Sequence, residues 1–170
     1  MKIAILGCGN PLVADDGLGV EAARRLASRG VPPGVELIEA GTPGLGLLEM
    51  IAGADKAVII DAVISGAAPG TIHRFTGDRL PKREFIPFSL HGFNLVDALE
   101  FGRKVQPGSL PREIVIIGVE AGDTAFGAGL SPAVEQALPR VIDSVMAEIV
   151  SEAAGDAAGF ADKPGCGKSG

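Results

Sequence analysis

The chain has 170 residues, 46% of them hydrophobic and only two of them cysteines, so it can bury the core of a single domain without disulfides or a structural metal. Its 15 Lys and Arg against 21 Asp and Glu give a formal net charge of −6, which argues against nucleic acid or an anionic membrane as a partner. The apolar runs are too short to span a bilayer and the first residues lack the features of a signal peptide, so we expect a cytoplasmic protein.

Short apolar runs rich in β-branched residues alternate with longer helical patterns, which is typical of a layered α/β domain. Residues 62–70 are too few for a crossover helix, so we expect the fourth strand to turn back antiparallel to the third. The pattern predicts a three-layer α/β sandwich whose twisted, mixed and mostly parallel five-stranded sheet carries helices on both faces. The predicted strands are 2–6, 35–39, 57–61, 71–75 and 113–119, and the predicted helices are 17–28, 45–52, 91–103 and 132–152.

The end of the chain differs from the rest in composition. Residues 153–170 are rich in Gly, Ala, Lys and Asp and offer little to bury, so we expect a flexible tail after a single domain of residues 1–152. Pro139 lies inside the last predicted helix, and it is expected to kink or interrupt that helix.

A glycine-rich loop, Gly7 to Gly19, joins the first strand to the first helix. It fails as a dinucleotide-binding fingerprint because Leu12 stands where the third glycine belongs. Two adjacent carboxylates, Asp15 and Asp16, would also repel a pyrophosphate there. One of them can cap the helix, but two exceed what capping needs, so we take Asp16 as a candidate site residue.

Asp61 directly follows a continuous apolar run in the third strand, where an ionised carboxylate seldom lies without a partner. Ligands of open α/β sheets bind beyond the carboxyl ends of the strands. If the first and third strands are neighbours and the second lies outside the first, Asp16 and Asp61 face one another at this edge. The structural alternative is that Asp61 merely begins a turn.

His91 opens the helix that precedes the last strand, which places it at the same edge of the sheet. The other histidine, His73, lies within a strand without comparable partners, so we interpret it as structural. Two carboxylates and an imidazole with open coordination positions suit a divalent cation, and zinc and nickel fit equally well. The sequence contains no HExxH, GxSxG or P-loop motif that would point to other standard hydrolase or nucleotide sites.

In their order and spacing, these segments resemble the hydrogenase maturation proteases, which process the large subunit of nickel–iron hydrogenases. The resemblance covers roughly residues 1–150. The residues that carry it are Gly7, Gly9, Asn10, Leu12, Asp15, Asp16, Gly17 and Gly19, then Gly41, Thr42 and Gly44, then Ile60-Asp61-Ala62, His91, Ile117-Gly118-Val119 and Leu130-Ser131-Pro132.

The resemblance implies a phosphorylase/hydrolase-like fold and a cytoplasmic endopeptidase that removes a C-terminal extension from the large-subunit precursor after nickel insertion. It implies that Asp16, Asp61 and His91 are both the catalytic and the metal-binding residues, with nickel brought by the precursor; zinc is another divalent ion that suits them. Some members have Glu where this chain has Asp16, which shortens the reach by one methylene. Asn10, Asp15, Gly41 and Thr42 are candidate substrate contacts, although a tight turn explains residues 41–44 equally well.

Two alternatives remain at this point. A maturation chaperone that binds the metal-loaded precursor without cutting it would use the same three ligands. The opening of the glycine-rich loop also resembles that of bacterial peptidyl-tRNA hydrolases, but their catalytic histidine is missing and the chain is acidic. The sequence leaves open whether a carboxylate acts as a general base or the metal polarises the scissile carbonyl. We expect a monomer, since nothing in the composition demands a large apolar interface.

Overall fold

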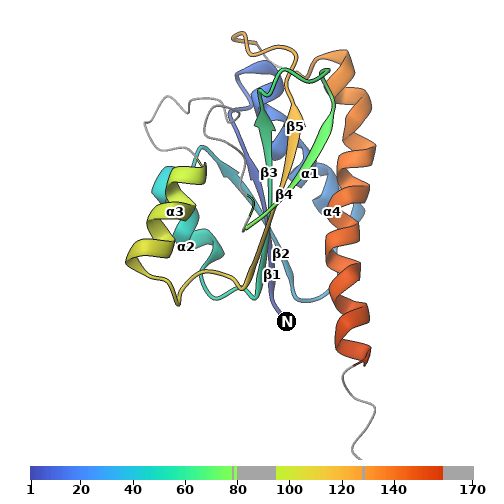
Figure 1. The fold of residues 1–170 in the computed structure, drawn as a ribbon. Helices are drawn as coiled ribbons and strands as arrows, with labels where there is room; N and C mark the ends of the chain where they lie inside the picture. The colour runs from blue at the N-terminus through green and yellow to red at the C-terminus, as the bar shows by residue number, and fades with distance from the viewer. Residues whose placement is uncertain (78, 80–94, 128, 159–170) are drawn as a thin grey trace, which may run out of the picture.

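The computed structural model describes residues 1–77, 79, 95–127 and 129–158, with side chains up to residue 150. Its centre is a sheet with the strand order β2-β1-β3-β5-β4 (Figure 1). Every predicted strand is present, with ends that differ by at most two residues, so the predicted fold class is confirmed. The strands are β1 (Ile3–Cys8), β2 (Val35–Gly41), β3 (Lys56–Val63), β4 (Ile72–Thr76) and β5 (Glu113–Glu120).

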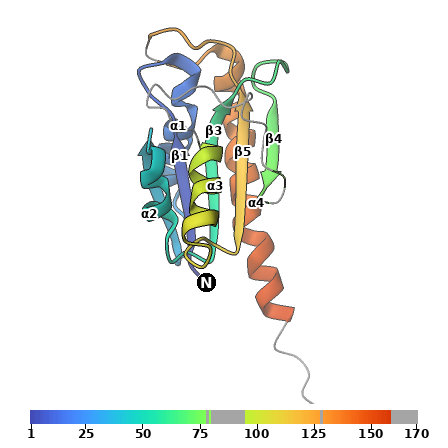
Figure 2. The ribbon, with the colours of Figure 1, turned by 60° about the vertical axis from the view of Figure 1, so that its left-hand side comes forward.

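Helices cover both faces of this sheet (Figure 2). One face carries α1 and α4, and the other carries α2 and α3, so the molecule has three layers. Continuous apolar runs in β3 and β5 fit this arrangement, because residues pointing to either face are buried. The helices are α1 (Leu18–Arg29), α2 (Leu47–Ile51), α3 (Leu95–Val105) and α4 (Pro132–Ala158), with 3-10 turns η1 (Ala14–Gly17) and η2 (Gly44–Gly46).

Alternate residues of β3 divide between the two cores. Val58, Ile60 and Ala62 pack under α1 and α4, whereas Ile59 and Val63 pack under α2 and α3. Asp61 takes its place in this second series, so its carboxylate lies on the face that carries α2 and α3. None of the helices in the described ranges is long and apolar enough to cross a membrane.

The position of β4 differs in part from the prediction. This strand does run against its parallel neighbours, but it pairs with β5, which lies between it and β3. A short connection fixes the direction of the returning strand, not its neighbour. Residues 64–71 span the end of β5 to reach the sheet edge, and Gly70 N donates to Glu120 O at 2.8 Å on the way.

The last helix is longer and more regular than predicted. α4 continues through Pro139 without interruption and includes residues 153–158, which the composition predicts to belong to the tail. Pro139 is exposed, so the ring meets water rather than packed neighbours. The remaining tail residues, 159–170, lie outside the described residues.

Candidate active site

The loop between β1 and α1 is held close to the sheet by glycines. Gly9 has φ of +111°, and a Cβ there would lie 1.7 Å from the carbonyl oxygen of Asp16. A Cβ on Gly19 would lie 2.3 Å from the carbonyl oxygens of both Cys8 and Ile60. The glycines of this motif therefore allow α1 to approach β1 and β3 closely, which brings η1 and its aspartates over the carboxyl ends of the two strands.

Asp15 fastens two loops to each other. Its side chain has no exposed surface, and its carboxylate accepts hydrogen bonds from Gly122 N, Asp123 N and Ser131 N at 2.7–2.8 Å and from Ser131 Oγ at 2.8 Å. Burial alone would raise the pKa of Asp15, but these donors hold it below its usual value. The structure thus gives Asp15 a structural role and leaves it no surface with which to contact a substrate.

Asp16, in contrast, lies within electrostatic reach of Asp61 on β3. It is half-buried, and Asn10 N donates to its Oδ2 at 2.7 Å. Burial raises the pKa of Asp16, and the Asn10 bond opposes that change in part. Asn10 is itself fixed, because its Oδ1 accepts a bond of 3.0 Å from Leu12 N.

Asp61 lies on β3, next to β1, as the sequence predicted. Burial and then the negative charge of Asp16 raise the pKa of Asp61 to about 7, against one opposing hydrogen bond of 2.9 Å from Ala62 N to Oδ1. The structure therefore brings Asp16 and Asp61 within electrostatic reach of each other at the carboxyl edge of the sheet. Two like charges in this position favour binding a proton or a cation.

Cys8 is a third group at this position, and the sequence analysis did not single it out. It ends β1 and is buried; burial, followed by the charges of Asp61 and Asp16, raises the pKa of its thiol. Its position at the end of the first strand, at the same edge as Asp61, is the feature of the sequence from which it could have been predicted. Within the described ranges, no three His, Cys, Asp or Glu side chains lie close enough together to hold a metal ion. His91 lies outside those ranges.

The other candidate contacts lie along the same edge. Gly9 N donates to Gly41 O at 2.8 Å, which ties the end of β2 to the loop that carries Asp16. Thr42 follows and is exposed, while Asn10 is half-buried. Gly41 has φ of +59° and Gly44 has φ of +53°, which fits the alternative interpretation of residues 41–44 as a tight turn.

His73 has a partner that the sequence analysis did not foresee, so our expectation that it lacked one is wrong. Its Nε2 lies 3.3 Å from Oε2 of Glu120, and its ring stacks on Phe75 with centroids 6.0 Å apart. Glu120 is 2% exposed and also accepts bonds from Ser65 N, Ser65 Oγ and Gly66 N at 2.7–2.8 Å. These contacts anchor the connection between β3 and β4, which is a structural role.

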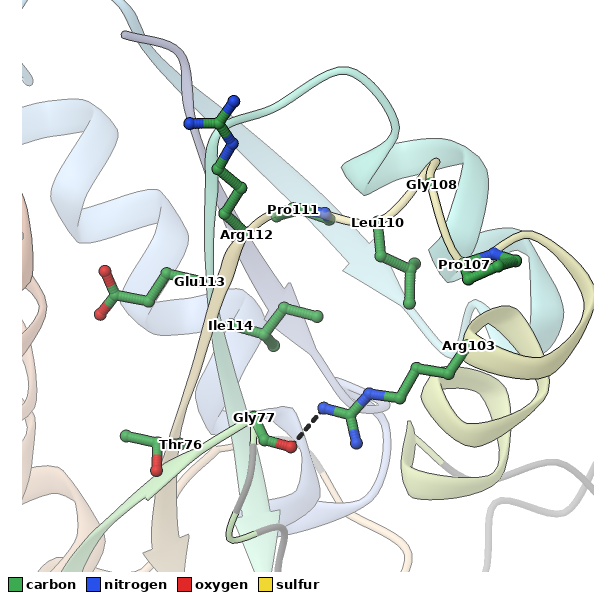
Figure 3. A pocket seen from close by; sticks show the side chains of 10 residues that line it. All are labelled: Thr76, Gly77, Arg103, Pro107, Gly108, Leu110, Pro111, Arg112, Glu113 and Ile114. Atoms are coloured by element: carbon green, nitrogen blue, oxygen red, sulfur yellow. Dashed lines mark hydrogen bonds between the residues drawn. The ribbon is translucent and has the colours of Figure 1, made fainter.

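A hollow of about 840 Å³ lies at the opposite, amino end of the sheet (Figure 3). Leu110 and Ile114 form part of its apolar lining, and the Arg103 guanidinium donates to the carbonyl oxygen of Gly77 across it. None of its lining residues belongs to the Asp16–Asp61 edge, so the candidate active site lies elsewhere.

Comparisons with known proteins identify the family. A family model described as hydrogenase maturation protease matches residues 20–148, which include Asp61 and His91 and begin after Asp16. The hydrogenase 2 maturation protease of Escherichia coli is 32% identical over 148 residues, covering 86% of this chain and 89% of that protein. This chain belongs to the hydrogenase maturation protease family.

Solved structures of the family agree with this membership. The hydrogenase maturating endopeptidase HybD from E. coli superposes with a TM-score of 0.78 at 28% identity, covering 89% of this chain and 94% of that one. The NiFe hydrogenase maturation protease HybD from Thermococcus kodakarensis gives 0.69 at 30% identity, covering 88% and 99%. The chain is therefore a hydrolase of the peptidase type, and the peptidyl-tRNA hydrolase alternative loses its support.

Proposed function

We propose that this protein removes the C-terminal extension from the large-subunit precursor of a nickel–iron hydrogenase after nickel has been inserted, acting as a monomer in the cytoplasm. The observation that carries the proposal is the pairing of Asp16 and Asp61 at the carboxyl edge of the sheet, in a chain of this protease family. Peptide hydrolysis requires groups that position water and accept a proton, and two partly desolvated carboxylates are suited to both tasks.

The same residues fit a divalent cation. Carboxylate oxygens and an imidazole nitrogen are ligands that nickel and zinc accept, so Asp16, Asp61 and His91 would hold nickel. In this proposal nickel arrives with the precursor as part of the substrate, and zinc is an alternative ion. A cation held by these carboxylates would offset the burial and the charge of Asp16 that together raise the pKa of Asp61. Cleavage would then depend on metal loading.

The chain's own residues set the geometry for the reaction. Asn10 N holds one oxygen of Asp16 at 2.7 Å, and Ala62 N holds Oδ1 of Asp61 at 2.9 Å, so each carboxylate has a fixed orientation. The described residues bind only one oxygen of each side chain. The second oxygen of Asp61 is therefore the atom suited to orient a water molecule and take its proton, and the negative charge of Asp16 favours the protonated form of Asp61 that results.

Incubation of the purified protein with nickel-loaded and nickel-free precursor tests this proposal directly. The mass of the precursor's C-terminal region is expected to fall only with the loaded form. Asp16→Asn, Asp61→Asn and His91→Ala are each expected to abolish the loss, whereas Arg112→Ala, an exposed change at the far end of the sheet, leaves it unchanged. Tight binding without cleavage would favour a maturation chaperone and contradict the proposal. Equal cleavage of both precursors would contradict the proposed nickel sensing but not the protease activity.

A further inference from the structure

Two large apolar side chains are mostly exposed on loops that adjoin the candidate active site. Leu12 is 63% exposed and Phe126 is 82% exposed, the highest values among the large hydrophobic residues of the described ranges. Single exposed apolar residues are common, but adjacent ones at the rim of a site indicate a binding surface. We refer to these two residues as the Leu12–Phe126 pair.

The backbones that carry the pair are joined to each other. Gly127 N donates to Leu12 O at 3.0 Å, and Ala14 N donates to Gly127 O at 2.9 Å. The buried carboxylate of Asp15 ties the same two loops together from beneath. The pair is therefore presented on a fixed double loop, so a ligand that covers it does not have to order these loops first.

The loop that presents Leu12 also positions the candidate catalytic carboxylate. Leu12 N bonds Asn10 Oδ1, and Asn10 N bonds Asp16 Oδ2, so two hydrogen bonds join the pair to the site. An extended peptide advances about 3.3 Å per residue, and its side chains reach neighbouring surfaces within a few residues of any bond held at Asp16. A substrate that runs from Asp16 along this loop would therefore reach the pair within a few residues.

We propose that the Leu12–Phe126 pair receives an apolar side chain of the precursor close to the cleaved peptide bond, an inference that rests on the proposed function. Burial of an aliphatic or aromatic side chain against Leu12 and Phe126 supplies binding energy that the two acidic residues of the site cannot supply. A second copy of this chain is a poorer occupant, because two chains of net charge −6 would bring their acidic edges together.

The test uses the full-length protein with Leu12→Ser, Phe126→Ser or both changes. Val105→Ser serves as the control, because Val105 is 58% exposed and lies at the end of α3 that leads into the amino end of β5. Processing of nickel-loaded precursor is followed over a range of concentrations. The double variant is expected to raise KM about tenfold or more with kcat within about twofold of wild type, and Val105→Ser is expected to change neither. The melting temperature should stay unchanged, since the altered side chains are exposed.

Unchanged kcat/KM in the double variant would overturn the inference. If it is unchanged while dimers seen for the wild type by ultracentrifugation disappear, the pair is a contact between copies of this chain. If the wild type cleaves no precursor, the proposed function fails by itself, and direct binding of precursor then decides. If the wild type binds the precursor and the double variant does not, the contact between the pair and the precursor is supported. Equal binding by both proteins, or binding by neither, overturns it.

Discussion

The two ends of the sheet differ in whether their buried charges have partners of opposite sign. At the amino end, Lys56 is 2% exposed, and its Nζ lies 3.1 Å from carboxylate oxygens of both Glu113 and Glu148. Arg74 adds bonds of 2.6 and 3.1 Å to Glu148. At the carboxyl end, Asp16 and Asp61 have no cationic partner within the described residues. The paired charges at the amino end therefore stabilise the fold, whereas Asp16 and Asp61 at the carboxyl end are suited to bind a cation or a substrate group that neutralises them.

Replacing the catalytic carboxylates tests this contrast most strongly. Asp61→Asn is expected to lower processing about a thousandfold or more, because the amide can neither accept a proton nor offer a charged ligand. The same change should raise the melting temperature at pH 8 in metal-free buffer. Buried Asp61, with its pKa raised to about 7, stabilises the fold only while protonated, and that stability is lost as pH rises from about 4 to about 7.

The gain in melting temperature should therefore be smaller at pH 5 than at pH 8. Asp143→Asn is the matched control, since Asp143 is 70% exposed and is paired with Arg29 at the surface. It should alter neither processing nor the pH dependence of melting. A variant Asp61→Asn that melts well below the wild type at pH 8 would contradict the view that this carboxylate is held at a cost.

At the amino end the same kind of change should act on stability alone. Lys56→Met is expected to lower the free energy of unfolding by about 3 kcal/mol, because it leaves Glu148 with less cationic compensation in a buried position. Urea denaturation measures the loss. Lys2→Met, which breaks the exposed pair with Glu36, should cost less than about 1 kcal/mol. Loss of processing by folded Lys56→Met protein would show that the two ends are not separate in role.

Asp15 sharpens the comparison, because it also lies at the carboxyl edge. Its carboxylate accepts four hydrogen bonds, whereas Asp16 and Asp61 each accept one from the described residues. Asp15→Asn would point an amide N–H₂ at backbone donors, so we expect a loss of about 2 kcal/mol in unfolding free energy. Processing should fall with it, since the loops that position Asp16 loosen. Unchanged stability would contradict the structural role, and thermal unfolding with a processing assay on the same sample decides.

This pair of neighbours also marks the limit of what the sequence predicts. Apolar runs place the strands and helices because burial imposes a period of two or 3.6 residues. The carboxyl-edge position of Asp61 follows from the same pattern. The local sequence does not show which of the two successive aspartates, Asp15 or Asp16, is fully buried and which remains partly exposed. That choice depends on the 3-10 turn η1, on φ of +32° at Ala14, and on backbone donors about a hundred residues away at Gly122 and Asp123.

Other differences have the same origin in distant contacts. The neighbour of β4 depends on which edge of the sheet is free, and the short connection between β3 and β4 does not encode that. The partner of His73 is Glu120, which lies 47 positions further along the chain, so local spacing could not predict it. In both cases residues remote in sequence decide the outcome, whereas local patterning decides the elements themselves.

Glu120 provides the smallest and most specific test, because it ends β5 at the carboxyl edge and is nevertheless fully bonded. Burial would raise the pKa of Glu120, but Ser65, Gly66 and His73 lower it below 4.5. Its bonds therefore stabilise the fold fully above about pH 4.5, and that contribution is lost as pH falls through the lower folded-state pKa. Glu120→Gln is expected to cost about 1 kcal/mol at pH 7, with the difference from wild type shrinking in acid.

Chemical denaturation at pH 7 and pH 3.5 measures that difference, and processing at pH 7 should stay near the wild-type rate. Such a result would show that a carboxylate at the carboxyl edge stabilises the fold, as the paired charges at the amino end do, when the chain supplies enough hydrogen-bond donors to it. A Glu120→Gln variant that keeps its stability but loses processing would contradict this and would extend the active edge from Asp61 across β5. The distinction between the two ends of the sheet would then rest on position rather than on bonding.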